Sequence, residues 1–224
     1  MNIRYQGNKN LVLLSGSSFE GLAINGRYSL SVNYLERIKS VLDKAVHEHA
    51  RLFIVRFDLH LPRRPDCNDF PIEYETNVIS RFFSSLTAQI NADLYRKINL
   101  GKRVHSCPVR YVWVKERHNA LQDHYHVALF LNHDTYFTIG SYQHSGSNLG
   151  TKIVDAWTRS LWLEYHLAGP LVHFPIHTPF YVLDKNAANF NINYQEAFHR
   201  LSYLAKVETK LYGDKNNSFG CSRK

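Results

Sequence analysis

The chain has 224 residues, of which 44% are hydrophobic and 21% are charged, a balance that excludes wholesale disorder and allows a packed core. Lys and Arg number 27 against 19 Asp and Glu, and the resulting net charge of +8 favours a polyanion or an acidic membrane surface as partner. Short apolar runs and three widely separated cysteines argue against a signal sequence, a transmembrane helix and a disulfide scaffold. We therefore expect a soluble cytoplasmic protein without a membrane partner.

The first part of the chain, residues 1–50, is expected to form an irregular arm over 1–29 and then a helix over 31–50. In that helix apolar residues recur at spacings of three and four, from Tyr34 to Ala45. Residues 51–224 are expected to form the main domain.

The sequence of the main domain predicts helices interspersed with strands. The expected strands cover 52–61, 109–116 and 124–131, short extended pieces cover 171–174 and 180–183, and helices cover 72–98, 148–167 and 194–212. The strands at 109–116 and 124–131 are joined by a polar turn, so the sheet is at least partly antiparallel. This order predicts an α+β fold with a central antiparallel sheet and helices packed on it.

The third expected strand carries a pair of histidines that can share a metal ion. His124 and His126 flank one residue, and on a strand residues i and i+2 point to the same face. Glu116 ends the preceding strand, and the turn can bring its carboxylate beside the two rings. Two histidines and one carboxylate leave coordination positions open for water or substrate and suit Mn²⁺ or Mg²⁺. The competing interpretation is two half-buried histidines on an ordinary strand.

The expected last helix carries a polar stripe. At 100° per residue, His199, Tyr203, Lys206 and Lys210 fall within about 60° of one another. A tyrosine with a lysine one turn later can act as a nucleophile, because an ammonium group and a metal lower the cost of forming the phenolate. The competing interpretation is a solvated helix face.

In this order the motifs resemble those of the HUH endonuclease superfamily: a strand ending in Glu, a turn, His-hydrophobe-His and then Tyr-x-x-Lys. A closer resemblance, to the YagK/YfjJ C-terminal-domain family, covers most of residues 51–224. This family is also known as the inovirus gene-2-type replication proteins of filamentous prophages. The resemblance is carried by residues 104–108, 110–114, 171–175, 200–206 and 218–223.

The resemblance implies a ferredoxin-like fold and a rolling-circle replication initiator that nicks and joins single-stranded DNA. His124 and His126 match the metal pair. Tyr203 matches the nucleophile, which becomes linked to a 5′ phosphate and frees a 3′ hydroxyl. Lys206 matches a lysine that neutralises developing charge, and His199 stands where a two-tyrosine enzyme has its second tyrosine.

The third metal ligand varies across the superfamily, so Asp58 or His60, on the polar face of the first strand, are alternatives to Glu116. Basic residues are expected to contact DNA phosphates, with a surface salt-bridge role as the alternative. These candidates are Arg56, Arg63, Arg64 and Lys210.

The expected partners are single-stranded or hairpin origin DNA, with host helicase and replication proteins. Residues 1–50 either extend the domain or recruit a host helicase. Three other functions fit the same residues: a transposase or relaxase with the same chemistry, a catalytically silent DNA-binding regulator of a prophage element, and a protein whose metal is structural.

Overall fold

A computed structural model describes residues 3–62, 77–117, 123–142, 146–177, 179–213 and 217–223. Within these residues the centre of the fold is a six-stranded sheet in which every pairing is antiparallel. Its strands are β5 (Arg51–His60), β6 (Arg110–Glu116), β7 (His124–Asn132), β8 (Val172–His173), β9 (Phe180–Asp184) and β10 (Phe219–Cys221). They lie in the order β10-β6-β7-β5, and β8 and β9 share the outer edge of β5.

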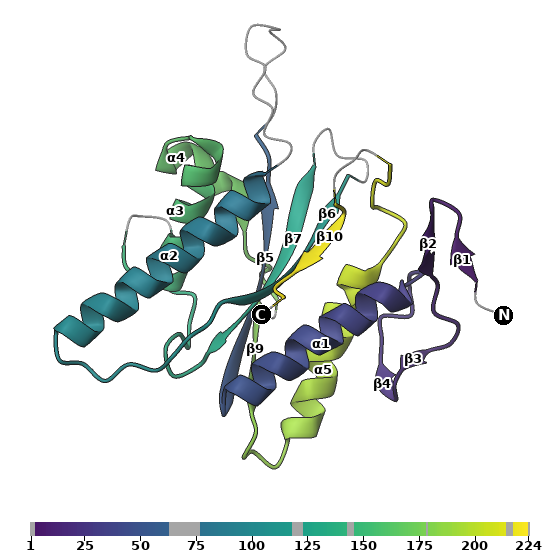
Figure 1. Ribbon diagram of the computed structural model, residues 1–224, viewed down its shortest axis with the longest axis horizontal. Coiled ribbons are helices and arrows are strands. Elements are labelled where there is room, and N and C mark those ends of the chain that lie inside the picture. The colour runs from purple at the N-terminus through teal and green to yellow at the C-terminus, as the bar shows by residue number, and fades with distance from the viewer. Residues whose placement is uncertain are drawn as a thin grey trace, which may run out of the picture.

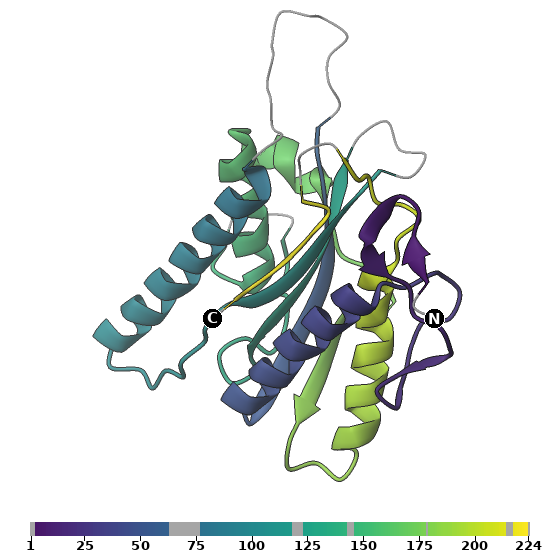
Figure 2. The same cartoon turned by 45° about the vertical axis from the view of Figure 1, so that its right-hand side comes forward.

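Helices cover both faces of the sheet (Figures 1 and 2). One face carries α2 (Val78–Asn99), α3 (Leu149–Leu161) and the short α4 (Tyr165–Ala168), and the other carries α1 (Val32–Glu48) and α5 (Phe190–Ser202). The alternation of β5 explains this arrangement, because Phe53, Val55 and Phe57 pack into the α2/α3 core while Leu52 and Ile54 pack into the α1/α5 core. The α+β class and the antiparallel sheet are thereby confirmed.

The α2/α3 core is built around Trp157, whose side chain is fully buried. Its ring meets Phe82 and Tyr125 edge-on, with centroids 5.9 and 6.2 Å away. Its indole Nε1–H donates a 3.0 Å hydrogen bond to the carbonyl of His60, at the end of β5. The bond ties α3 to the strand end at which the polar residues described below gather.

The N-terminal segment is more ordered than expected. Two short hairpins, β1 (Arg4–Tyr5) with β2 (Asn8–Val12) and β3 (Ser18–Phe19) with β4 (Leu22–Ala23), replace the irregular arm. Leu11, Phe19 and Ile24 are buried in the α1/α5 core, and this burial accounts for the order.

Helix α1 confirms the expected helix over 31–50. Ser31 caps its N-terminus by accepting from the backbone N–H of Tyr34, and the six apolar residues predicted to face inward are all buried.

Two predicted helices have different bounds in the structure. The helix expected over 148–167 breaks after Leu161, because Trp162 adopts a left-handed conformation with φ 53°. The helix expected over 194–212 begins at Phe190 and ends at Ser202. Of the helix expected over 72–98, residues 72–76 lie outside the described ranges, and α2 begins at Val78. Among the described residues, no helix combines the length and apolar character that a membrane span requires.

Candidate metal centre and tyrosine site

Polar side chains from three neighbouring strands meet at one end of the sheet, on the face that α1 and α5 cover. The register of the β5–β7 pair sets Asp58 opposite His126 and His60 opposite His124. The β6–β7 register sets Glu116 opposite His124. The predicted hairpin geometry, which brings the glutamate beside the two histidines, is confirmed.

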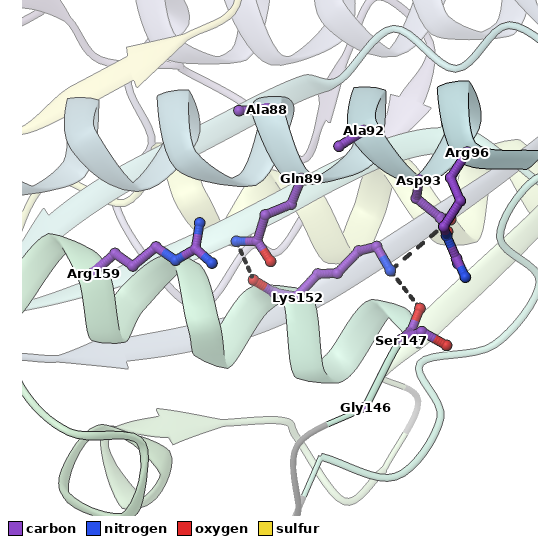
Figure 3. A pocket seen from close by; sticks show the side chains of 9 residues that line it. All are labelled: Ala88, Gln89, Ala92, Asp93, Arg96, Gly146, Ser147, Lys152 and Arg159. Carbon is purple, nitrogen blue, oxygen red and sulfur yellow. Dashed lines mark hydrogen bonds and ion pairs between the residues drawn. The ribbon is translucent and has the colours of Figure 1, made fainter.

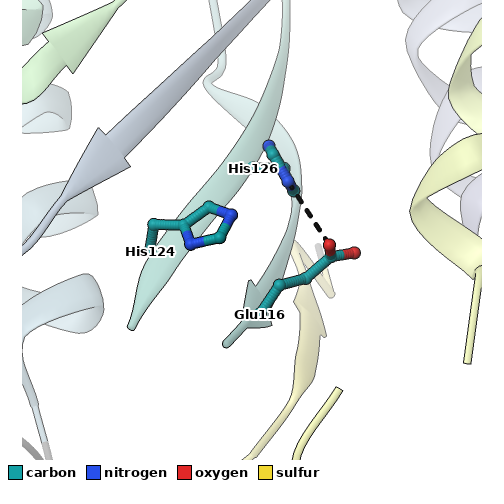
Figure 4. A group of neighbouring side chains, drawn as sticks. All are labelled: Glu116, His124 and His126. Atoms are coloured by element: carbon teal, nitrogen blue, oxygen red, sulfur yellow. Dashed lines mark ion pairs between the residues drawn. The ribbon is translucent and has the colours of Figure 1, made fainter. Parts of the chain in front are cut away.

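Glu116, His124 and His126 each offer one ligand atom within 4.8 Å of the others (Figure 4). Glu116 Oε2 lies 3.5 Å from His126 Nε2, while the other ring nitrogen of His126 lies 2.5 Å from Asp58 Oδ1. Nδ1 of His124 is buried and has no hydrogen-bond partner within the described part of the chain. An orphaned imidazole nitrogen beside a buried carboxylate and a second imidazole fits a divalent metal ion.

The protonation states of His124 and Glu116 favour the same use. Burial, reinforced by the charges of His126 and His60, lowers the pKa of His124 to about 4, so its ring is neutral at pH 7. Burial acts to raise the pKa of Glu116, but the hydrogen bond from His126 and the charge of Lys210 outweigh it and hold that pKa well below its usual range. A neutral imidazole and a carboxylate are the forms that bind metal.

Asp58 and His60, the alternative third ligands, lie beside the candidate metal ligands and not among them. The carboxylate of Asp58 meets the far nitrogen of His126, which is the usual position of a group that orients a ligand from behind. The exposed ring of His60 stacks on His124 with centroids 5.3 Å apart. Among the described residues, the set of donors close enough to share an ion includes neither side chain.

Tyr203 lies next to this centre and is linked to it by Lys206. Lys206 Nζ donates a 2.8 Å hydrogen bond to the Tyr203 hydroxyl and lies 3.2 Å from Glu116 Oε2. Lys210 Nζ lies 3.4 Å from Glu116 Oε1, and the Tyr203 and His126 ring centroids are 5.9 Å apart. Both lysines are buried. Glu116 therefore joins the histidine pair and the tyrosine–lysine pair into one cluster.

The pKa values of the two lysines shift in opposite directions. Burial acts to lower the pKa of Lys206, but the hydrogen bond to Tyr203 and the charge of Glu116 raise it overall. Burial lowers the pKa of Lys210 to about 8, against the attraction of Glu116. Lys206 is therefore an ammonium group at neutral pH and donates to the phenol oxygen.

The helical stripe predicted for this segment is wrong in its geometry. After Ser202 the chain makes a 3₁₀ turn over Tyr203–Ala205, and Lys206 then becomes extended and forms a bridge with Leu30. With this backbone conformation Lys206 and Lys210 still reach Glu116, and Tyr203 reaches Lys206. His199 is exposed, and no hydrogen bond, ion pair or ring contact joins its side chain to the cluster within the described part of the chain.

Arg56 occupies a different position from the one expected for a DNA contact. It is buried, with its guanidinium carbon 5.2 Å from the Tyr203 ring centroid and one NH₂ group 3.6 Å from Asp58 Oδ1. Its place on the polar face of β5 agrees with the predicted alternation, but it faces the tyrosine. Arg63 and Arg64 lie outside the described residues.

Two aromatic side chains at the site were not singled out from sequence. Tyr28, in the N-terminal segment, meets the Tyr203 ring edge-on at 5.4 Å, and Lys206 Nζ lies 5.0 Å from the Tyr28 ring centroid. His173 on β8 has its Nδ1 4.0 Å from Asp58 Oδ2. Neither has a local pattern that marks it, because its partners lie far away in the chain.

The fold and the site together define an α+β domain with a histidine–carboxylate group beside a half-buried tyrosine that is hydrogen-bonded to a buried lysine. The chain belongs to the YagK/YfjJ C-terminal domain family, whose sequence profile matches residues 18–222. It is 40% identical to the uncharacterized protein YagK of Escherichia coli K12 over 196 residues, which cover 86% of this chain and 93% of YagK. It is 35% identical to the uncharacterized protein YfjJ of the same strain over 195 residues, or 85% of this chain and 93% of YfjJ. No solved structure matches the chain.

Proposed function

We propose that this protein is a metal-dependent, single-tyrosine endonuclease of the HUH type that nicks and joins single-stranded DNA to initiate rolling-circle replication. The observation that carries the proposal is the single buried cluster in which Glu116 contacts His126, Lys206 and Lys210, with Tyr203 bonded to Lys206. The strand order supports it, since β9-β5-β7-β6 is the order of a split βαβ, ferredoxin-like sheet.

In this function Glu116, His124 and His126 hold the divalent ion, which when bound supplies Lewis-acid polarisation of phosphoryl oxygens. The net charge of +8 suits a DNA substrate. The donor set is compatible with Mn²⁺ and with Mg²⁺, and does not choose between them.

Residues of the chain itself carry out the exchange of the phosphodiester bond for a phosphotyrosine bond. The Tyr203 oxygen forms a bond to phosphorus, its proton passes to solvent, and the bond between phosphorus and the 3′ oxygen breaks. The departing strand takes up one proton as a 3′ hydroxyl, and the 5′ phosphate stays on Tyr203. Lys206 donates a hydrogen bond to the tyrosine oxygen and stabilises the phenolate charge without accepting the proton. Joining reverses these steps, with a 3′ hydroxyl attacking the phosphotyrosine.

The test is formation of a covalent protein–DNA adduct. The protein is incubated with Mn²⁺ and fluorescent single-stranded oligonucleotides that tile the origin region of the element that encodes it, and the products are separated on a denaturing gel. Tyr203→Phe is compared with Tyr95→Phe, which alters an exposed tyrosine on α2, on the opposite face of the sheet.

An adduct formed by the wild type and Tyr95→Phe but lost in Tyr203→Phe supports the proposal. An adduct that survives in Tyr203→Phe assigns the nucleophile elsewhere. Tight binding without any adduct refutes catalysis and leaves a DNA-binding regulator with the same fold.

A further inference from the structure

A pocket of about 490 Å³ lies beside the tyrosine site, at the edge of the sheet where β8 and β9 pair with β5. It is lined by His173, Pro175, Ile176, His177, Tyr181 and Arg200. Its volume falls within the range of pockets that bind small organic groups, about 300–1,000 Å³. The lining combines aromatic and apolar surface with one guanidinium group, which is the composition of a site for a base and a phosphate.

The pocket is adjacent to the residues around Tyr203. His173 Nδ1, on its wall, lies 4.0 Å from Asp58 Oδ2. Burial raises the pKa of the Tyr181 hydroxyl, and the charges of Arg200 and Arg56 both oppose that rise. Arg56 in turn lies over the Tyr203 ring. Tyr181 pairs with Ile54, two residues before Arg56, so Tyr181 and Arg56 lie on the same face of the sheet.

Both arginines have unused hydrogen-bonding capacity. Nε of Arg56 and Nε of Arg200 are buried and have no hydrogen-bond partner among the residues that the structure describes. A buried N–H without a partner is costly, and an incoming phosphate oxygen would satisfy it. Glu196 lies one turn before Arg200 on α5. Its charge acts to raise the pKa of Tyr181, whereas the charge of Arg200 acts to lower it. The rim also carries exposed apolar surface, since Ile176 is 87% exposed.

The pocket between α2 and α3 gives a useful contrast (Figure 3). It is similar in size, about 520 Å³, and also basic. Two of its three cations have partners within the pocket. Arg96 donates a 2.7 Å hydrogen bond to Asp93, and Lys152 donates to the Ser147 carbonyl and lies 3.9 Å from Asp93. Arg159, on the rim of this pocket, offers a matched control arginine on the opposite face of the sheet.

We propose that the pocket beside Tyr203 binds one nucleotide of the single strand, next to the phosphodiester that the tyrosine attacks. Arg200 contacts the backbone phosphate of that nucleotide, and its base stacks on Tyr181. This inference rests on the proposed function, because it takes the substrate to be single-stranded DNA.

The test measures binding apart from cleavage. A fluorescein-labelled oligothymidylate of twelve nucleotides is titrated with the full chain and followed by fluorescence anisotropy at several salt concentrations. Tyr181→Ala and Arg200→Ala are each expected to weaken binding by about tenfold, the usual effect of losing one base stack or one charged contact. Arg200→Ala is also expected to reduce the salt slope by about one. Tyr181→Phe, which retains the stacking ring, and Arg159→Ala are expected to stay within about twofold of the wild type.

Thermal melting shows whether each variant is folded. If an alanine variant does not fold, the conservative variants Tyr181→Phe and Arg200→Lys keep the test valid. The adduct assay is run alongside. If adducts form but Tyr181→Ala and Arg200→Ala bind like the wild type, the pocket assignment is wrong and the endonuclease stands. If no adduct forms but both variants lose affinity, the nucleotide pocket stands and the endonuclease does not. Equal losses in Arg159→Ala and Arg200→Ala refute the pocket, because the effect is then one of general charge.

Discussion

The carboxylate of Asp58 is expected to strengthen metal binding without being a ligand. Its Oδ1 lies 2.5 Å from His126 Nδ1, which holds the ring proton on that nitrogen and leaves Nε2 directed toward Glu116. Loss of such an orienting carboxylate weakens metal affinity by about 10- to 100-fold, or about 1.4–2.7 kcal/mol. Asp58→Asn keeps an acceptor for the ring N–H and is expected near the lower figure. Asp58→Ala keeps none and is expected near the higher one.

The affinity is measured by titrating Mn²⁺ into the full chain and following the heat of binding. Glu116→Gln removes a direct ligand, so it is expected to lose more affinity than either Asp58 variant. The matched control is Asp134→Asn, which alters the carboxylate paired with Arg51 at the opposite end of β5 and is expected to bind Mn²⁺ like the wild type.

Two results would refute the reasoning. If Asp58→Ala binds Mn²⁺ as tightly as the wild type, the contact with His126 does not orient a ligand. If Asp58→Ala abolishes binding while Glu116→Gln retains it, Asp58 is itself the third ligand and the assignment of Glu116 is wrong.

Three further outcomes are expected. Lys206→Ala should slow adduct formation by about 10²- to 10³-fold, because Tyr203 loses the donor that stabilises its phenolate; an unchanged single-turnover rate would remove Lys206 from the chemistry. Trp157→Ala should lower the free energy of unfolding by about 3–5 kcal/mol in urea titrations, since the side chain is fully buried; a loss under 1 kcal/mol would contradict this packing. Asp93→Asn should cost about 1–3 kcal/mol at pH 7. Burial acts to raise the pKa of Asp93, but hydrogen bonds from Arg96 and Lys97 lower it overall. The stabilisation by Asp93 is therefore full above its pKa in the unfolded chain, near 4, and is lost as the pH falls through its pKa in the folded protein. A loss of unfolding free energy in Asp93→Asn that stays constant from pH 7 to pH 2 would contradict this account.

Local periodicity was enough to predict the strands that carry Glu116, His124 and His126. The period of two in β5 and β7 assigned the polar residues to one face, and the short hairpin placed Glu116 beside His124. These relations depend on residues close together in the chain or directly opposite in one register. For the same reason the capped helix α1, with its spacing of three and four, was predicted with its buried face correct.

Features set by distant contacts could not be predicted in this way. Helix α5 stops at Ser202 because the following residues form backbone bonds with the N-terminal segment, Ser31 N–H to Ala205 carbonyl and Val207 N–H to Ser29 carbonyl. A helical wheel carries no information about such a partner. Arg56 was assigned to the correct face of β5, but the ring it covers belongs to a tyrosine much later in the chain.

The charges buried around Tyr203 explain how the two halves of the site depend on each other. Arg56, Lys206 and Lys210 contribute three cations, and Asp58 and Glu116 contribute two carboxylates. All of these side chains are buried except that of Asp58, which is half-buried. When Glu116 shares its charge with a divalent ion, it neutralises the two ammonium groups less, and the cluster becomes more positive. A phosphodiester restores the balance, so metal and DNA should each strengthen the binding of the other by the same factor. Glu116 is the residue through which this coupling passes, because it contacts both His126 and the lysines.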